Sequence, residues 1–257
     1  MKNCLKWMAM ICLALLIVQP DVARAAELRV LTTGAIKPIL EAMLPAYEQQ
    51  SGNSVTVFKD TAGGVLKRVA AGENFDVILA PPSVITALIG RGKVLPGSKI
   101  DLIKVGVGVA VKAGTPEPDI SSVAAFKQAL LAAHHVTYID PASGGSSGIY
   151  LAKLFQKLGI AADIKSKSVL SEGGLSATNL VSGQADIAIQ QISELMLVKG
   201  VTVVGPLPAA IQNYTVYSGG IGAHTQKKAA ANALLKLLAS PAAVKLLQEK
   251  GMEPAGS

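Results

Sequence analysis

The sequence predicts an α/β protein with two lobes, each built from mostly parallel strands with helices on both faces. Strand-like and helix-like segments alternate along almost the whole chain, which is typical of βαβ units. Two long β-runs interrupt the alternation and predict two crossings between the lobes, near residues 105–112 and 207–218. Lobe I is expected to comprise residues 26–108 and 215–257, and lobe II residues 109–214.

In the expected first lobe, strands and helices alternate three times. Leu28-Arg-Val-Leu-Thr-Thr33 is a strand pattern, and apolar residues from Ile36 to Tyr47 then recur at helical spacing. The elements that follow are a strand at 55–58, a helix at 65–69, a buried strand at 75–79 ended by Pro81-Pro82, a helix to Gly90 and the long β-run at 105–111.

A second series of strands and helices follows the Gly/Pro-rich loop at 114–118. Helices are expected at 123–133, 149–158, 175–181 and 192–198, and strands at 136–139, 167–170, 186–189 and 201–204. The β-run at 214–221 then returns the chain to the first lobe, where helices at 229–238 and 242–250 complete it.

A secretory signal is expected ahead of the two lobes. A basic start, an apolar stretch at 8–18 and a small-x-small pattern at 23–25 predict cleavage after about Ala25 and a secreted protein. The apolar stretch is too short to span a bilayer. Cys4 and Cys12 both lie in this segment, so the mature chain is expected to contain no disulfide and no thiolate site.

The segment DPASGGSSGIYLAKLF, residues 140–155, places six Gly and Ser residues between a predicted strand and a predicted helix. A helix N-terminus attracts anions because its first N–H groups are unpaired and its dipole is positive there. A Ser-capped helix start after a tight turn is the ordinary alternative. The residues expected to bind an anion here are Ser143, Gly144, Gly145, Ser146 and Ser147.

Short Thr/Gly junctions of the same kind recur at other strand-to-helix boundaries. Ligands of open α/β sheets bind at the carboxyl ends of the strands, so the repetition favours binding over capping. The additional candidates are Thr33, Gly34 and Ala35, then Thr61, Ala62 and Gly63, and Gly173 in the second lobe. Lys37 and Lys59 are possible charge partners, although a solvated position is the more ordinary interpretation of each.

Composition limits the classes of ligand. The formal net charge is +7, and this mild excess suits a small anion. No basic run is interleaved with aromatic residues, so a nucleic-acid partner is not expected. The pair His134-His135 has no third ligand at metal-binding spacing, so a metal site is not expected. The three histidines of the chain, His134, His135 and His224, are expected at a helix end and beyond a strand, away from the loop serines, so a conventional hydrolase is not expected either. We expect a monomer that needs no cofactor.

Five segments occur in the order and spacing of a known family. They are LRVLTTGAIKPILEAMLPAYEQQSG, FDVILAPPSVITALIGRGKV, DPASGGSSGIYLAKLFQKLGI, LVSGQADIAIQ and ANALLKLLASPAAVKLLQEKGME. Over its whole mature length the chain resembles the periplasmic molybdate-type, class II, solute-binding proteins. The resemblance implies a clamshell that closes on a small anion and delivers it to a membrane transporter, an ABC-type permease.

The resemblance also maps the family's oxyanion ligands onto this sequence. Its first serine falls at about Ala35, its second at Ala62 or Gly63, and its tyrosine donor at Gln191. The second-lobe amide donors map to Gly144–Ser147 and to Gly173. Each lost hydrogen bond to a charged ligand should cost about 1.5–3 kcal/mol, so an organic di- or tricarboxylate is favoured over molybdate.

An enzymatic alternative follows from the same resemblance, because some proteins with this fold are similar to aconitate isomerase. Such a cofactor-free enzyme moves a double bond in a tricarboxylate, which requires a base, a proton donor and groups that stabilise an enolate-like intermediate. The titratable candidates near the predicted cleft are Glu172, Asp60 and Tyr150. None has a spacing that demands catalysis, so transport is the preferred hypothesis and isomerisation the alternative.

Overall fold

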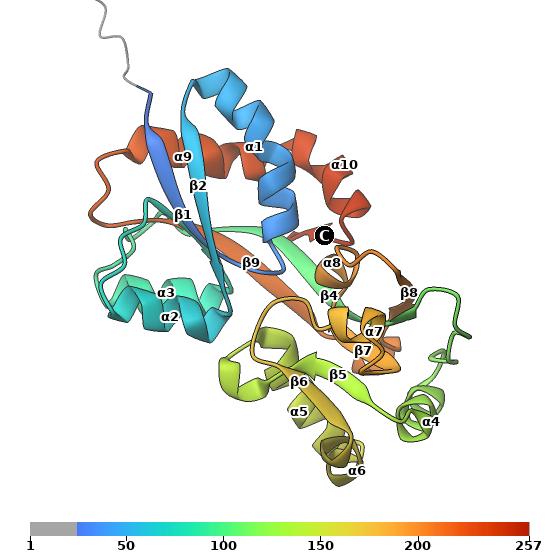
Figure 1. Cartoon of the computed structure of the whole chain (residues 1–257). Helices are drawn as coiled ribbons and strands as arrows, with labels where there is room; N and C mark the ends of the chain where they lie inside the picture. Colours follow the sequence, from blue (N-terminus) through green and yellow to red (C-terminus); the bar gives the residue numbers. More distant parts are fainter. Residues whose placement is uncertain (1–24, 257) are drawn as a thin grey trace, which may run out of the picture.

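The protein, in a computed structural model that describes residues 25–256, contains one mixed β-sheet covered by helices (Figure 1). The strand order is β2-β1-β3-β9-β4-β7-β5-β6, and β8 and β10 also pair with β4. Apart from its last residue, the predicted signal segment at 1–25 lies outside the described residues.

The observed elements follow the predicted alternation closely. The strands are β1 (Glu27–Thr33), β2 (Ser54–Asp60), β3 (Val77–Ala80), β4 (Ile100–Lys112), β5 (Val136–Ile139), β6 (Ser168–Ser171), β7 (Ile187–Gln191), β8 (Val201–Pro206), β9 (Tyr214–Ile221) and β10 (Glu253–Pro254). The helices are α1 (Lys37–Ser51), α2 (Ala62–Ala70), α3 (Pro82–Gly90), α4 (Val123–Ala132), α5 (Ser146–Lys157), α6 (Ala161–Ser166), α7 (Thr178–Val181), α8 (Ile192–Leu195), α9 (Lys228–Leu238) and α10 (Pro241–Glu249). Single 3₁₀ turns lie at Pro141–Ser143 and Ala209–Ile211.

The prediction of mostly parallel sheets is correct only at the two ends of this sheet. β1 pairs in parallel with β2 and β3, and β5 pairs in parallel with β6 and β7. In the middle, β4 is antiparallel to β7, β8, β9 and β10, and β3 is antiparallel to β9. The two long β-runs pair with each other and join both ends into one mixed sheet. The division into two lobes therefore stays a prediction.

Helices pack apolar faces onto each end of the sheet. In α1 the buried residues Ile39, Leu40, Met43 and Tyr47 recur at helical spacing and lie in a core with β1, β9 and α9. At the other end, α4 and α5 cover β5 and β7 in a separate cluster. No single helix among residues 25–256 has the length and apolar composition to cross a membrane. Taken together, α9 and α10 have that length and composition, but the pair is bent by 59° at its junction.

The topology brings several strand ends to the centre of the molecule. Thr33 ends β1 and is paired in register with Asp60, which ends β2. At the other end of the sheet, Ile139 ends β5 and Gln191 ends β7, and these two strands are also parallel. The loops after these strands face one another, as the contacts of the site demonstrate.

Candidate active site

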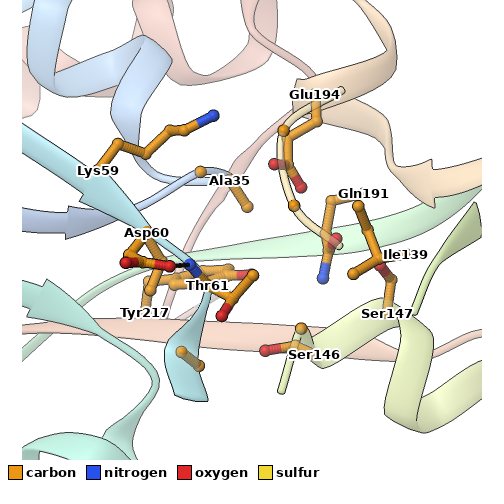
Figure 2. Close-up of a pocket in the computed structure, with 16 residues that line it drawn as sticks. Ala35, Lys59, Asp60, Thr61, Ile139, Ser146, Ser147, Gln191, Glu194 and Tyr217 are labelled. Carbon is orange, nitrogen blue, oxygen red and sulfur yellow. Dashed lines mark hydrogen bonds between the residues drawn. The ribbon is translucent and has the colours of Figure 1, made fainter. Parts of the chain in front are cut away.

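A cavity of about 220 Å³ lies where the carboxyl ends of β1, β2, β5 and β7 converge (Figure 2). Its volume suits a small ligand, because pockets for drug-sized molecules measure about 300–1,000 Å³. Of the predicted ligand-binding residues, those that line it are Thr33, Gly34, Ala35, Thr61, Ala62, Gly145, Ser146, Ser147, Gly173 and Gln191. The sequence therefore located the cavity, while the contacts of these residues with a ligand stay predictions.

Besides the four-residue helix α8, three longer helices begin at this cavity. The N-cap positions are Ile36 for α1, Thr61 for α2 and Gly145 for α5. α5 begins at Ser146, three residues before the predicted helix, so Ser146 and Ser147 form its first turn. The first N–H groups of a helix lack partners within the helix, and its dipole is positive there. Three such ends favour an anion in the cavity.

Gly63, Ser143 and Gly144 do not line the cavity, because they form the contact that closes one side of it. The Thr61 hydroxyl donates to the carbonyl oxygen of Ser143 at 2.6 Å, and the Gly63 N–H donates to that of Gly144 at 3.2 Å. A Cβ at position 144 would lie 2.7 Å from the Gly63 Cα. Glycine at these positions therefore permits two backbone segments, one from each end of the sheet, to touch.

Two of the three catalytic candidates lie away from the cavity. Glu172 lines an outer groove with Asp140 and Arg68, beyond the Thr61–Ser143 contact. The Tyr150 hydroxyl donates to the carbonyl oxygen of Ile211, so a partner already occupies it. Tyr150 follows a Gly-rich junction and Glu172 precedes one, but neither residue lines the cavity.

Asp60 does line the cavity, and its carboxylate is partly occupied. Asp60 Oδ1 accepts from the Thr61 N–H at 2.7 Å, and Oδ2 lies 3.9 Å from the Arg68 guanidinium. These contacts suit a residue that holds the start of α2 in place.

Glu194 is the carboxylate that sequence reasoning missed. It lies in the short helix α8, is only 7 % exposed and lines the cavity. Burial raises the pKa of the Glu194 carboxyl to about 7, while Gln190 and the positive charge of Lys59 act in the opposite direction. An acidic residue in the first turn of a helix is ordinary, so the sequence carried little signal beyond its place just after Gln191.

Gln191 connects Glu194 to the first turn of α5. With its amide nitrogen facing Glu194, the side chain donates to Glu194 Oε2 at 3.1 Å and to Ser147 Oγ at 3.0 Å. Its amide oxygen then accepts from the Ser147 N–H at 3.3 Å. Ser147 is itself buried, so this bridge fixes the carboxylate beside the anion-attracting end of α5.

Besides Gly174, two further cavity residues were not predicted as ligand contacts. Tyr217 lies in β9 and is 2 % exposed, and Ile139 ends β5. Burial raises the pKa of the Tyr217 phenol, the nearby Glu194 adds to this rise, and interactions with Ser146, Thr215 and Gln191 oppose it. The phenol therefore stays neutral and can donate a hydrogen bond. Both residues lie in ordinary strand patterns, so the sequence gives no sign that they line a cavity.

Charge and unpaired donors complete the description of the site. Lys59 lines the cavity from an exposed position, whereas Lys37 forms an ion pair with Glu41 on the surface of α1. Thr33 Oγ1 is buried at the cavity and has no hydrogen-bond partner among the residues that the structure describes. Within residues 25–256, no group of three or more His, Cys, Asp or Glu side chains is arranged to hold a metal ion. The site thus combines the N-terminal ends of helices with one buried carboxyl group, that of Glu194.

Comparisons with known proteins agree with this architecture. Residues 28–253 match the family described as bacterial extracellular solute-binding protein. An aconitate isomerase from Pseudomonas sp. is 34% identical over 233 residues, which cover 88% of this chain and 87% of that protein.

Solved structures share the fold. The periplasmic molybdate-binding protein of Azotobacter vinelandii aligns with a TM-score of 0.71 and 20% identity over 88% of this chain and 98% of that chain. The sulfate-binding protein SubI of Mycobacterium tuberculosis H37Rv aligns with a TM-score of 0.71 and 20% identity, over 90% of this chain and 87% of that chain. At this identity the likeness establishes the α/β fold of molybdate-binding proteins and nothing finer.

Proposed function

Because the chain belongs to the bacterial extracellular solute-binding protein family, we propose that it encloses a small organic anion in the central cavity and isomerises it. The proposed reaction moves a proton between two carbon atoms of an unsaturated di- or tricarboxylate, and aconitate is the first substrate to test. The observation that carries the proposal is the buried carboxylate of Glu194.

In its ionised form, this carboxylate opposes the binding of an anion. Two like unit charges about 4 Å apart repel by about 4 kcal/mol at the effective dielectric constant of a protein site. A base that must remove a proton, by contrast, works best when its pKa is close to the ambient pH. The pKa of about 7 at Glu194 meets that requirement.

The remaining walls suit an organic anion. The starts of α1, α2 and α5 and the charge of Lys59 can bind carboxylates, and the unpaired Thr33 hydroxyl can add a hydrogen bond. Ala35, Ala62 and Ile139 give the cavity apolar walls, which a carbon skeleton can contact. A tetrahedral metal oxyanion would leave these walls unused.

The proposed chemistry is a balanced proton shift. The Glu194 carboxylate takes a proton from a carbon next to the conjugated system, and the C–H electron pair delocalises onto a ligand carboxylate. The protonated Glu194 then donates a proton to the carbon at the other end of the allylic unit. The double bond has moved, and no electrons or atoms have been gained or lost.

We also infer that residues 26–108 with 215–257 form one lobe and 109–214 the other, and that they close over the ligand. Support comes from the hydrophobic clusters, since one contains Leu28, Val105 and Leu234 and another contains Val109, Phe126 and Ile189. Family membership supports export to the periplasm with cleavage after about Ala25.

The second candidate function is a transport receptor, a monomer that passes its anion to an ABC-type permease. The observation that favours it is the fold shared with the periplasmic molybdate-binding protein. In that case Glu194 would stay protonated when the anion is bound and donate a hydrogen bond to it.

A proton NMR time course with the purified mature protein separates the two functions. Wild type and Glu194→Gln are each mixed with cis- or trans-aconitate, and thermal shifts with citrate, sulfate and molybdate measure binding. We expect new vinyl signals with wild type only, while E194Q still binds. Stabilisation by a carboxylate with an unchanged spectrum would instead identify a receptor.

A further inference from the structure

We propose that Tyr217 is a second catalytic residue, whose hydroxyl donates a hydrogen bond to the ligand oxygen that becomes negative when Glu194 removes the proton. This inference rests on the proposed function and deepens it. It assigns the stabilising role to a residue at the centre of the sheet rather than to the loops that surround the cavity.

The position of Tyr217 is rigid. The residue is paired with Ile103 of β4, and its side chain is buried in the hydrophobic core that α1 and α9 form with β1 and β3. Figure 2 shows Tyr217 and Glu194 on opposite sides of the cavity, both among the residues that line it. A ligand between them would meet a base on one side and a phenol on the other.

The surroundings of the Tyr217 hydroxyl differ from those of the other buried tyrosines. The Tyr47 hydroxyl donates to the Ala230 carbonyl oxygen at 2.9 Å, and that of Tyr138 lies 3.0 Å from Ser168 Oγ. Both are structural contacts outside the cavity. The groups around the Tyr217 hydroxyl are instead side chains of the site itself, those of Ser146, Gln191 and Glu194, together with Thr215.

The charge balance of the reaction explains why such a donor is useful. Before the proton moves, Glu194 carries the negative charge, and afterwards Glu194 is neutral while the ligand oxygen is negative. The phenol keeps its own proton throughout, because burial and Glu194 raise its pKa. A donor that is already in place stabilises the new charge without reorganisation.

The test compares Tyr217→Phe with Tyr47→Phe, a control at an equally buried tyrosine whose hydroxyl lies outside the site. Removing one such donor typically lowers kcat by about 10²–10³-fold, and we expect this loss in Y217F and wild-type kcat in Y47F. Affinity for tricarballylate, a saturated tricarboxylate, should change little in Y217F. A nitronate analogue carries a charge like that of the enolate, so Y217F should lose affinity for it by a factor similar to its loss of kcat.

Two outcomes would overturn this inference while leaving the proposed function intact. In the first, wild type isomerises aconitate and Y217F has the same kcat. In the second, Y217F loses as much affinity for tricarballylate as for the nitronate. If Y217F does not fold, fluorotyrosine at position 217 keeps the shape and strengthens the donor, and it should bind the nitronate more tightly than wild type. Tighter binding supports the inference, and unchanged binding overturns it. A wild type that neither isomerises aconitate nor exchanges its protons in D₂O overturns the proposed function and this inference with it.

Discussion

Gly34 lies against the carboxylate of Glu194, and a Cβ at position 34 would stand 2.2 Å from Glu194 Oε1. Non-bonded heavy atoms do not approach this closely, so only glycine leaves space for the carboxylate in its present place. Gly34 follows β1 and Glu194 follows β7, so the contact joins two distant parts of the chain at the cavity. Nearby, the Ser193 hydroxyl donates to the Ala35 carbonyl oxygen at 2.9 Å.

Replacing Gly34 with alanine should therefore displace Glu194 while leaving the fold largely intact. A displacement of about 1 Å at a catalytic group can cost about 10²-fold in rate, and overpacking costs about 1–3 kcal/mol in stability. The measurement is kcat for aconitate isomerisation together with urea unfolding. Gly90→Ala is the matched control, since a Cβ there meets nothing within 4 Å and both properties should stay near wild type. Wild-type kcat in G34A would contradict the role of the contact.

The stability of the protein should depend on pH through Glu194. Its pKa is about 7 in the folded protein and near its ordinary value of 4.5 in the unfolded chain, so the folded state holds a proton that the unfolded state releases. Stability should therefore fall as pH rises from about 4.5 to about 7, by roughly 3 kcal/mol in total. Glu194→Gln should lack this component and exceed wild type in urea resistance at pH 8 but not at pH 4.5. Parallel pH profiles for both proteins would refute the buried titration.

Catalytic activity should depend on the same ionisation of Glu194, but it should rise with pH where stability falls. The rate constant kcat/KM should rise with pH through about 7 as Glu194 becomes a base. Since the charge of Lys59 lowers the pKa of Glu194, Lys59→Met should shift this rise to higher pH. Lys37→Met is the control, because Lys37 pairs with Glu41 outside the cavity. The measurement is kcat/KM of wild type and both variants from pH 5 to 9. Equal shifts in K59M and K37M would indicate a general effect of net charge rather than an effect of Lys59 on Glu194.

Among the residues that line the cavity, those that the sequence singled out are the ones with local signals. Thr33, Thr61 and Ser146 stand where a strand pattern gives way to a helix pattern, and parallel strands bring such junctions to one edge. Glu194 and Tyr217 carry no such signal, because their burial at the cavity depends on strands far away in the sequence. The pairing of β4 with β9 escaped prediction for the same reason, since periodicity identifies a strand but not its partner.

The two serines at the start of α5 should have separable roles. Replacing both with alanine should weaken anion binding strongly, because each hydrogen bond to a charged ligand contributes about 1.5–3 kcal/mol, with little loss of fold. The single variants sharpen this expectation. Ser146→Ala should mainly weaken binding, whereas Ser147→Ala also removes the hydroxyl that Gln191 contacts and should lower kcat. Calorimetric titration with citrate and steady-state kinetics measure the two effects. Unchanged affinity in the double variant would refute the assignment of this loop.

Closure over the ligand should depend on the hydroxyl of Thr61. It donates to the Ser143 carbonyl oxygen at 2.6 Å and accepts from the Gly64 N–H at 2.9 Å, so one atom caps α2 and links it to the loop before α5. Thr61→Val keeps the shape but leaves both partners without this hydroxyl, and loss of the cap alone costs about 0.5–2 kcal/mol.

We expect T61V to bind carboxylates more weakly, by about tenfold for a loss near 1.4 kcal/mol. Small-angle scattering of T61V without ligand should give a larger radius of gyration than wild type, because the link across the cavity is missing. Thr61→Ser retains the hydroxyl and should restore both affinity and compactness. If T61V instead keeps the affinity and compactness of wild type while T61S loses them, the methyl group that faces Gly173 rather than the hydroxyl holds the two segments together, and the hydrogen bond to Ser143 contributes nothing to closure.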